Sequence, residues 1–139
     1  AMLEECDMDS RPEAYFDLVP WEVLANINHN FYLSERKKNF LRYVGGLLYT
    51  EVSVPAAFQN IKMAGERLSV GDIGVGYWDL HIREDIRHGQ WMLDEVAPPL
   101  IEKYPEDAWD MIKGYDQQKF MSSRSVSAIV ESIRLLEVS

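Results

Sequence analysis

The sequence is poor in cysteine and in basic residues, and both shortages narrow its possible classes. Cys6 is the single cysteine among 139 residues. No disulfide can therefore form within the chain, and a reducing, cytoplasmic location is expected. Lys and Arg total 14 against 23 Asp and Glu, which gives a formal net charge of -9. This acidity argues against nucleic acid or an anionic membrane surface as a partner.

Long hydrophobic runs and strand patterns are also lacking. The run from Val44 to Tyr49 is among the longest, whereas a membrane-spanning helix needs about 20 apolar residues. The acidic start, Ala1 to Asp7, has neither the basic nor the apolar region of a signal peptide. No sustained alternation of apolar and polar residues and no Asn-Gly or Asp-Gly turn occurs. Neither a membrane segment nor a β-sheet is expected.

What remains is a composition typical of one globular domain, with 47% hydrophobic and 27% charged residues. Helical spacing of apolar residues predicts an all-α fold, with an irregular or partly helical lead-in over 1–19 and a bundle of about four or five helices over 20–139. The expected helices cover about residues 20–30, 34–68, 77–96, 104–120 and 122–136.

Several residues set the expected helix boundaries. Ser34 is a candidate N-cap, and Pro55 should kink or break the long helix that follows. The glycine-rich tract 69–76 predicts a loop. On the last helix, the buried side is expected to hold the aliphatic residues Val126, Ile129, Val130 and Ile133.

The segment from His81 to His88 carries the clearest functional signal. In a helix, His81, Asp85 and His88 stand at i, i+4 and i+7, so the three side chains share one face. Two imidazoles and a carboxylate are suited to iron, manganese or zinc. A solvated helix face is the simpler interpretation, but the flanking residues are large and apolar, and a buried His/Asp cluster needs a partner such as a cation.

Glu51 is a fourth candidate ligand, thirty residues before His81 on what reads as the preceding antiparallel helix. Its neighbours from Tyr49 to Val54 carry no other charge, which favours a ligand over an ordinary exposed glutamate. His29 is interpreted as a capping or surface residue.

Other catalytic motifs are missing. Gly71, Gly74 and Gly76 do not follow a strand, and no Gly-Lys-Ser/Thr occurs, so a phosphate-binding loop is excluded. There is no Gly-x-Ser-x-Gly elbow and no His-Glu-x-x-His zinc motif. No catalytic residue beyond the metal ligands is therefore assigned.

The motifs resemble a known family. The string Tyr43-Val44-Gly45-Gly46-Leu47-Leu48-Tyr49-Thr50-Glu51-Val52-Ser53-Val54-Pro55, followed after about thirty residues by Tyr77-Trp78-Asp79-Leu80-His81 and His81-x-x-x-Asp85-x-x-His88-Gly89, is similar to the haem-oxygenase-like diiron oxidases and oxygenases, also called iron-containing redox enzymes. The resemblance covers roughly residues 22–137 and corresponds to the C-terminal part of the family fold.

The resemblance implies a site and an activity. Glu51, His81, Asp85 and His88 would be ligands of non-haem iron, in a diiron site if complete, with manganese or zinc as the less favoured metals. The domain would be an iron-dependent oxidoreductase that uses O2 to oxidise a small organic substrate. Tyr49, Tyr77 and Trp78 would lie in a pocket or around the ligands, although core packing also explains them.

The chain departs from the family in length. Family members are longer, and their N-terminal helices supply another glutamate together with a Glu and His about ten residues apart. No such pair precedes residue 51. The resemblance therefore implies a fragment, a domain of a larger protein, or a short relative whose bundle is completed by a homodimer or a partner chain.

Two alternatives stay open. The first is a non-catalytic helical interaction or assembly domain with a relic or partial metal site. The second is a metal-independent enzyme on the related thiaminase-like fold, which would need a core cysteine, whereas Cys6 lies near the terminus.

Overall fold

The protein is described by a computed structural model that covers residues 2–137, and over these residues it is helical without a strand. The main helices are joined by short 3-10 turns and one π-helical turn. In chain order the elements are α1 (Met2–Glu5), η1 (Pro12–Leu18), α2 (Trp21–Ser34), η2 (Lys37–Asn39), α3 (Phe40–Arg67), α4 (Asp72–Trp91), η3 (Met92–Val96), α5 (Ala97–Lys103), η4 (Pro105–Asp107) and α6 (Trp109–Glu137). None of the helices in this range is long and apolar enough to cross a membrane.

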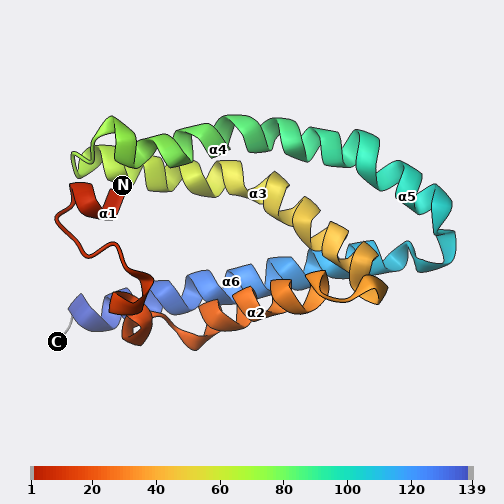
Figure 1. The fold of residues 1–139 in the computed structure, drawn as a ribbon, viewed down its shortest axis with the longest axis horizontal. Coiled ribbons are helices and arrows are strands. Elements are labelled where there is room, and N and C mark those ends of the chain that lie inside the picture. Colours follow the sequence, from red (N-terminus) through yellow and green to blue (C-terminus); the bar gives the residue numbers. More distant parts are fainter. Residues whose placement is uncertain (1, 138–139) are drawn as a thin grey trace.

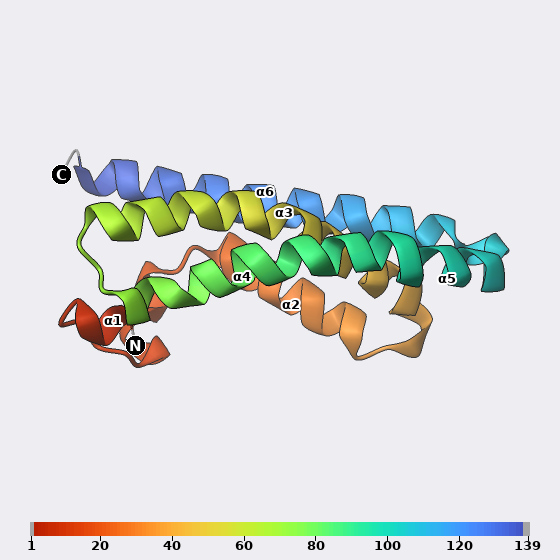
Figure 2. The ribbon, with the colours of Figure 1, turned by 90° about the horizontal axis from the view of Figure 1, so that it is seen from above.

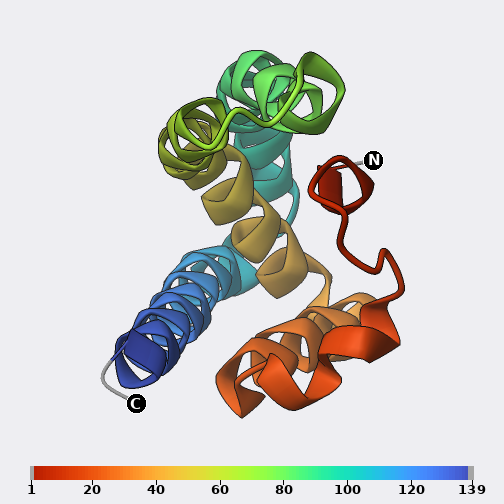
Figure 3. The ribbon, with the colours of Figure 1, turned by 90° about the vertical axis from the view of Figure 1, so that its left-hand side faces the viewer.

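Four long helices set the architecture, and α3 connects its two sides. The C-terminal part of α3 lies along α4, whereas its N-terminal part packs on α6 and approaches α2 (Figure 1). Seen from above, α4 and α5 form one continuous rod beside α3 (Figure 2). Seen end-on, the α3–α4 pair and the α2–α6 pair diverge from each other, with α1 near α4 (Figure 3). The two pairs are therefore joined at one end and splayed at the other.

The best-packed core lies where α3, η3, α5 and α6 meet. It consists of apolar side chains that are at most 8% exposed, namely Leu41, Val44, Met92, Ala97 and Met111. Burying such side chains stabilises the fold by roughly 1.5–3 kcal/mol for each large one. This core holds the joined end of the bundle together.

Helices α3 and α6 cross in direct backbone contact. A Cβ atom placed on Gly45 would lie 1.8 Å from the carbonyl oxygen of Met111, and one on Gly114 would lie 1.9 Å from that of Arg42. Two glycines therefore permit an approach that no other residue allows. Arg42 also pairs with Asp110, at 3.0 Å between Nη2 and Oδ1.

The reversal between α3 and α4 is short and has a defined hydrogen-bond pattern. Ser69 adopts a left-handed conformation with φ of 60°. Beside it, the Val70 N–H donates to the Gly65 carbonyl and the Ser69 N–H to the Glu66 carbonyl, each at 3.0 Å. These are the two bonds of a Schellman motif, which ends a helix sharply. The α4 helix can therefore fold back directly along α3.

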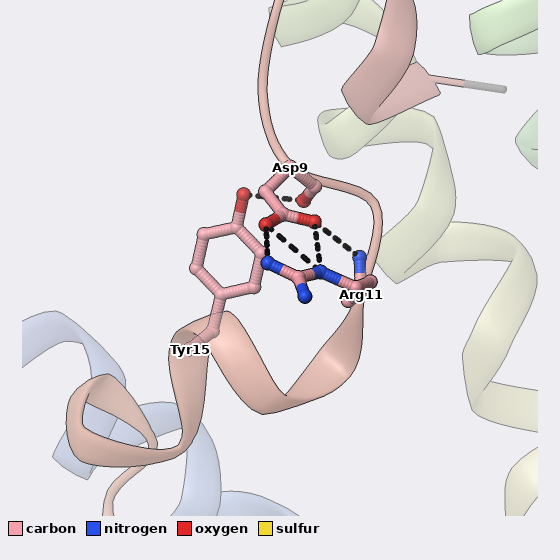
Figure 4. A network of polar contacts seen from close by, with 3 residues as sticks. All are labelled: Asp9, Arg11 and Tyr15. Atoms are coloured by element: carbon pink, nitrogen blue, oxygen red, sulfur yellow. Dashed lines mark hydrogen bonds and ion pairs between the residues drawn. The ribbon is translucent and has the colours of Figure 1, made fainter.

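The N-terminal segment docks on the start of α4. The Gly74 N–H donates to Glu5 Oε2 at 3.1 Å, so a carboxylate caps a helix that has no side-chain cap of its own. Between α1 and η1, Asp9 accepts hydrogen bonds from Arg11 through its carboxylate and from the Tyr15 hydroxyl through its carbonyl (Figure 4). The lead-in, expected to be irregular or partly helical, is thus partly helical over its described residues and tied to the bundle.

Three predicted boundaries differ from the structure. Ser34 is not an N-cap but the last residue of α2, and α3 begins at Phe40, because Arg36 turns the chain into an extended conformation. The tract 69–76 is a loop only to Gly71. Gly74 is helical and buried against Val70 and Met2, where its lack of a side chain is needed for packing rather than for a turn.

The last two predicted helices are one. α6 runs without a break near Ser122. Within it, the Ser125 hydroxyl lies 2.9 Å from the Met121 carbonyl oxygen and 3.0 Å from that of Glu22, which ties α6 to the start of α2. The expected burial of the last helix was wrong. Val126, Ile129, Val130 and Ile133 are 39–60% exposed, since α6 continues past the start of α2 at Trp21.

Pro55 does not break α3, which is continuous from Phe40 to Arg67. The helix instead changes direction between its two halves (Figure 1), as expected for a proline inside a helix. This bend is consistent with α3 packing on α6 in its first half and on α4 in its second half.

Candidate metal centre

The α3–α4 pair brings Glu51, Asp85 and His88 together. Glu51 is near the middle of α3, and Asp85 and His88 are one turn apart on α4. Gly89 faces the same contact: a Cβ there would lie 3.5 Å from the Glu51 carbonyl oxygen. The small residue lets the two helices approach closely, and the three side chains meet beside this contact.

The geometry of this triad suits a single ion. Each residue offers one ligand atom, and the three atoms lie within 4.8 Å of one another. His88 Nδ1 is 3.3 Å from Glu51 Oε2 and 3.5 Å from Asp85 Oδ1. The side chains of Asp85 and Glu51 are 10% and 20% exposed, whereas that of His88 is 43% exposed. The carboxylates are thus held inside, and the imidazole stands at the edge.

The negative charge of Glu51 is only partly compensated by its surroundings. Burial raises the pKa of Glu51, the neighbouring Asp85 carboxylate raises this pKa further, and His88 and His81 act in the opposite direction. Glu51 Oε2 is buried and, despite its nearness to His88, receives no hydrogen bond. A buried polar atom without a partner costs about 1–3 kcal/mol.

A divalent cation would supply the missing positive charge at this position. It would compensate two buried carboxylates that repel each other and would occupy the free oxygen of Glu51. Two carboxylates and one imidazole form a ligand set suited to iron, manganese or zinc. The residues therefore fit a metal site.

His81, the fourth predicted ligand, lies near the triad but is not part of it. Its Nδ1 is 2.8 Å from the Tyr77 carbonyl oxygen. Because a carbonyl can only accept, Nδ1 donates in this bond, and Nε2 is the ring nitrogen that the bond does not use. Its ring packs on Tyr77, with centroids 4.2 Å apart, and against Phe58 at 5.8 Å. Ligation by His81 stays a prediction.

The three aromatic residues expected around the ligands lie in different places. Tyr49 faces α6, where its ring meets Tyr115 edge-on at 5.3 Å. Tyr77 stacks on His81 and touches Trp78 at 5.8 Å. Tyr77 therefore borders the candidate centre, and Tyr49 packs between helices.

Two residues were overlooked or misjudged from the sequence. Phe58 supports His81, and its place seven residues after Glu51 on the same helix was the available signal. His29 was interpreted as a capping or surface residue. Its Nε2 is buried without a hydrogen-bond partner, and burial, followed by the charge of Arg42, lowers its pKa.

Comparisons with known proteins point to one family. The model of the iron-containing redox enzymes matches residues 1–118. The nitrosourea synthase of Streptomyces achromogenes subsp. streptozoticus is 23% identical over 120 residues, which are 86% of this chain and 26% of that enzyme. The chain thus spans about a quarter of the length of this curated relative. No solved structure matches.

The family match covers most of the chain, including Glu51, His81, Asp85 and His88. It confirms the resemblance read from the sequence and the all-helical, haem-oxygenase-like fold. The chain belongs to the iron-containing redox enzyme family.

Proposed function

We propose that this chain is a non-haem iron domain of an oxidase or oxygenase, in which Glu51, Asp85 and His88 hold iron. The observation that carries the proposal is the buried Glu51 Oε2, which has no hydrogen bond and lies within a triad of ligand atoms. Membership of the iron-containing redox enzymes supports iron over manganese or zinc.

The chain's own residues have distinct roles in this proposal. Glu51 and Asp85 bind as carboxylates, and His88 binds as a neutral imidazole. Since His81 Nδ1 is bonded to the Tyr77 carbonyl, His81 would join as a fourth ligand through Nε2. Iron bound in such a site supplies the activation of O2 for oxidation of a small organic substrate.

A diiron centre would need ligands from outside this chain. Among the described residues the structure brings three candidate ligands together, whereas helical di-iron carboxylate sites take a Glu from each of two helices and a Glu-x-x-His pair from each of two others. We infer that a second copy or a partner chain supplies the remaining ligands and covers His88, whose side chain is 43% exposed. A reducing cytoplasm, consistent with a single cysteine, would keep the iron ferrous.

The test is an anaerobic Fe(II) titration that records metal content and oligomer mass together. His88→Gln should abolish tight binding, because it removes an imidazole without leaving a large cavity. His29→Gln is the matched control, since His29 lies on α2, away from the triad. Circular dichroism of both variants separates loss of metal from loss of fold.

The outcomes separate the two main hypotheses. Iron bound by the wild type and the His29 variant, but lost in the His88 variant, supports the metal domain. Absence of binding in the wild type, together with unchanged stability of His81→Ala, would instead support a helical interaction module.

A further inference from the structure

A second hollow lies away from the metal triad, between α3, α5 and α6, and its volume is about 610 Å3. Its floor is formed by Leu48, Ala97 and Met111, and its rim by Leu93, Ile101 and Ile112. The rim side chains are 46–50% exposed. Clefts of roughly 300–1,000 Å3 with mainly apolar walls are typical of small-molecule sites.

This cleft is separate from the candidate metal centre. Leu93 follows His88 by five residues on one continuous helical rod, so the two side chains are about 140° apart around it. Leu48 stands one turn before Glu51 on α3 and lines the cleft, whereas Glu51 belongs to the triad. The two sites are therefore neighbours along α3, but no residue of the triad lines the cleft.

The wall of the cleft owes its shape to two prolines. Pro98 and Pro99 have no N–H, and a proline ring in a regular α-helix collides with the carbonyl four residues earlier. The chain avoids this collision by widening the turn: η3 is π-helical, and the Ala97 N–H donates to the Met92 carbonyl. Leu93 and Pro98, five residues apart, consequently lie on the same face, and both line the cleft.

The polar side chains of the cleft favour a positively charged ligand. Of its nine lining residues, seven are apolar, and the others are Glu102 and Tyr115. The adjacent Lys103 does not neutralise Glu102, since its Nζ lies over the Tyr104 ring, 5.3 Å from the centroid. The prolines also supply no N–H donor to the wall. A ligand therefore meets aliphatic walls, the Tyr115 side chain and a single charged group, the Glu102 carboxylate, on a chain with a net charge of -9.

We propose that this cleft binds an alkyl ammonium ion, with the alkyl chain against the aliphatic walls and the ammonium group beside Glu102. A fatty acid of equal length would fill the same walls but would place its carboxylate against Glu102. Charge complementarity thus distinguishes the two ligands, although their apolar parts are the same.

The experiment is a calorimetric titration of the full chain with octylammonium and with octanoate. Octylammonium should bind at least about fivefold more tightly, the range of one exposed ion pair gained and one repulsion avoided. Shortening the amine stepwise to butylammonium should weaken binding about threefold for each partly buried methylene. Glu102→Gln should remove the preference for the amine and leave octanoate binding equal or stronger.

A matched pair of variants locates the binding. Ile101→Ser removes an exposed rim residue of the cleft and should weaken both ligands about threefold. Ile86→Ser removes an exposed isoleucine on α4, outside the cleft, and should change neither. Equal affinity for both ligands, equal effects of the two serine variants, or no binding would each overturn the proposal. So would a concentration-dependent dimer by sedimentation that Ile101→Ser dissociates, because the occupant would then be a second copy.

Discussion

Replacing Gly45 by alanine tests the packing on which the whole arrangement depends. The new Cβ atom would lie 1.8 Å from the Met111 carbonyl oxygen, and real Cβ contacts are no shorter than 3.0 Å. The helices α3 and α6 must therefore shift by about 1.2 Å. Both sides of the contact are helix backbone, so no flexible side chain can absorb the displacement.

The cost can be compared with a neighbouring position. Overpacking a core costs about 1–3 kcal/mol and sometimes more, and a rigid backbone contact belongs at the upper end. Gly46→Ala is the matched control, because its Cβ would meet Gln118 at an ordinary 3.6 Å. It should gain about 1 kcal/mol of helix propensity. Gly45→Ala makes the same propensity gain, which cancels in the comparison, so the two variants should differ by roughly 3 kcal/mol in unfolding free energy.

Urea unfolding followed by circular dichroism measures this difference. With a slope of about 2 kcal/mol per molar urea, the midpoints should be separated by about 1.5 M. Gly114→Ala should behave like Gly45→Ala, since its Cβ would lie 1.9 Å from the Arg42 carbonyl oxygen. If Gly45→Ala and Gly46→Ala unfold at the same midpoint, the direct crossing of α3 and α6 is refuted.

Three further changes have defined signs. The hydrogen bond from Arg42 lowers the pKa of Asp110 below 3.8. Asp110→Asn should therefore cost about 0.5–1 kcal/mol of unfolding free energy at pH 7. This loss should shrink as the pH falls toward the lowered pKa. The pKa of Glu51 is raised above 4.5. Glu51→Gln should therefore stabilise the metal-free chain by about 1 kcal/mol, and this stabilisation should increase as the pH rises from 4.5. An unchanged melting temperature would contradict this. Glu5→Ala removes the cap on Gly74 and should cost about 1 kcal/mol, measurable as faster amide exchange at the start of α4.

The fold class could be predicted from the sequence because helical periodicity identifies which residues share a face. Helical spacing predicts one core-facing side for Phe40, Leu41, Val44, Leu47, Leu48, Val52 and Phe58. Of these, Leu41 and Val44 are buried, whereas Phe40 and Val52 are 48% and 45% exposed. Periodicity does not say how far a neighbouring helix extends, so Ile129 and Ile133 were placed in a core that ends before them. Nor could it show that Gly74 is needed for packing, which required α1 and Val70 to be in place.

The site was predicted in part for the same reason. Residues three and four apart on α4 must share a face, and Glu51 was assigned by its isolation among uncharged neighbours. The structure brings Glu51, Asp85 and His88 together. His81 turns its Nδ1 to the Tyr77 carbonyl, a local choice of rotamer that spacing cannot reveal.

The Schellman turn at Ser69 has a consequence for the evolution of this chain. The length of this turn fixes which residue of α4 lies opposite each residue of α3. One residue inserted into the connection 68–71 would rotate α4 by about 100° and shift it by about 1.5 Å. Asp85 and His88 would then turn away from Glu51, although every ligand remained in the sequence. Loops usually tolerate insertions, but a working relative with this pair of helices must conserve the length of this one.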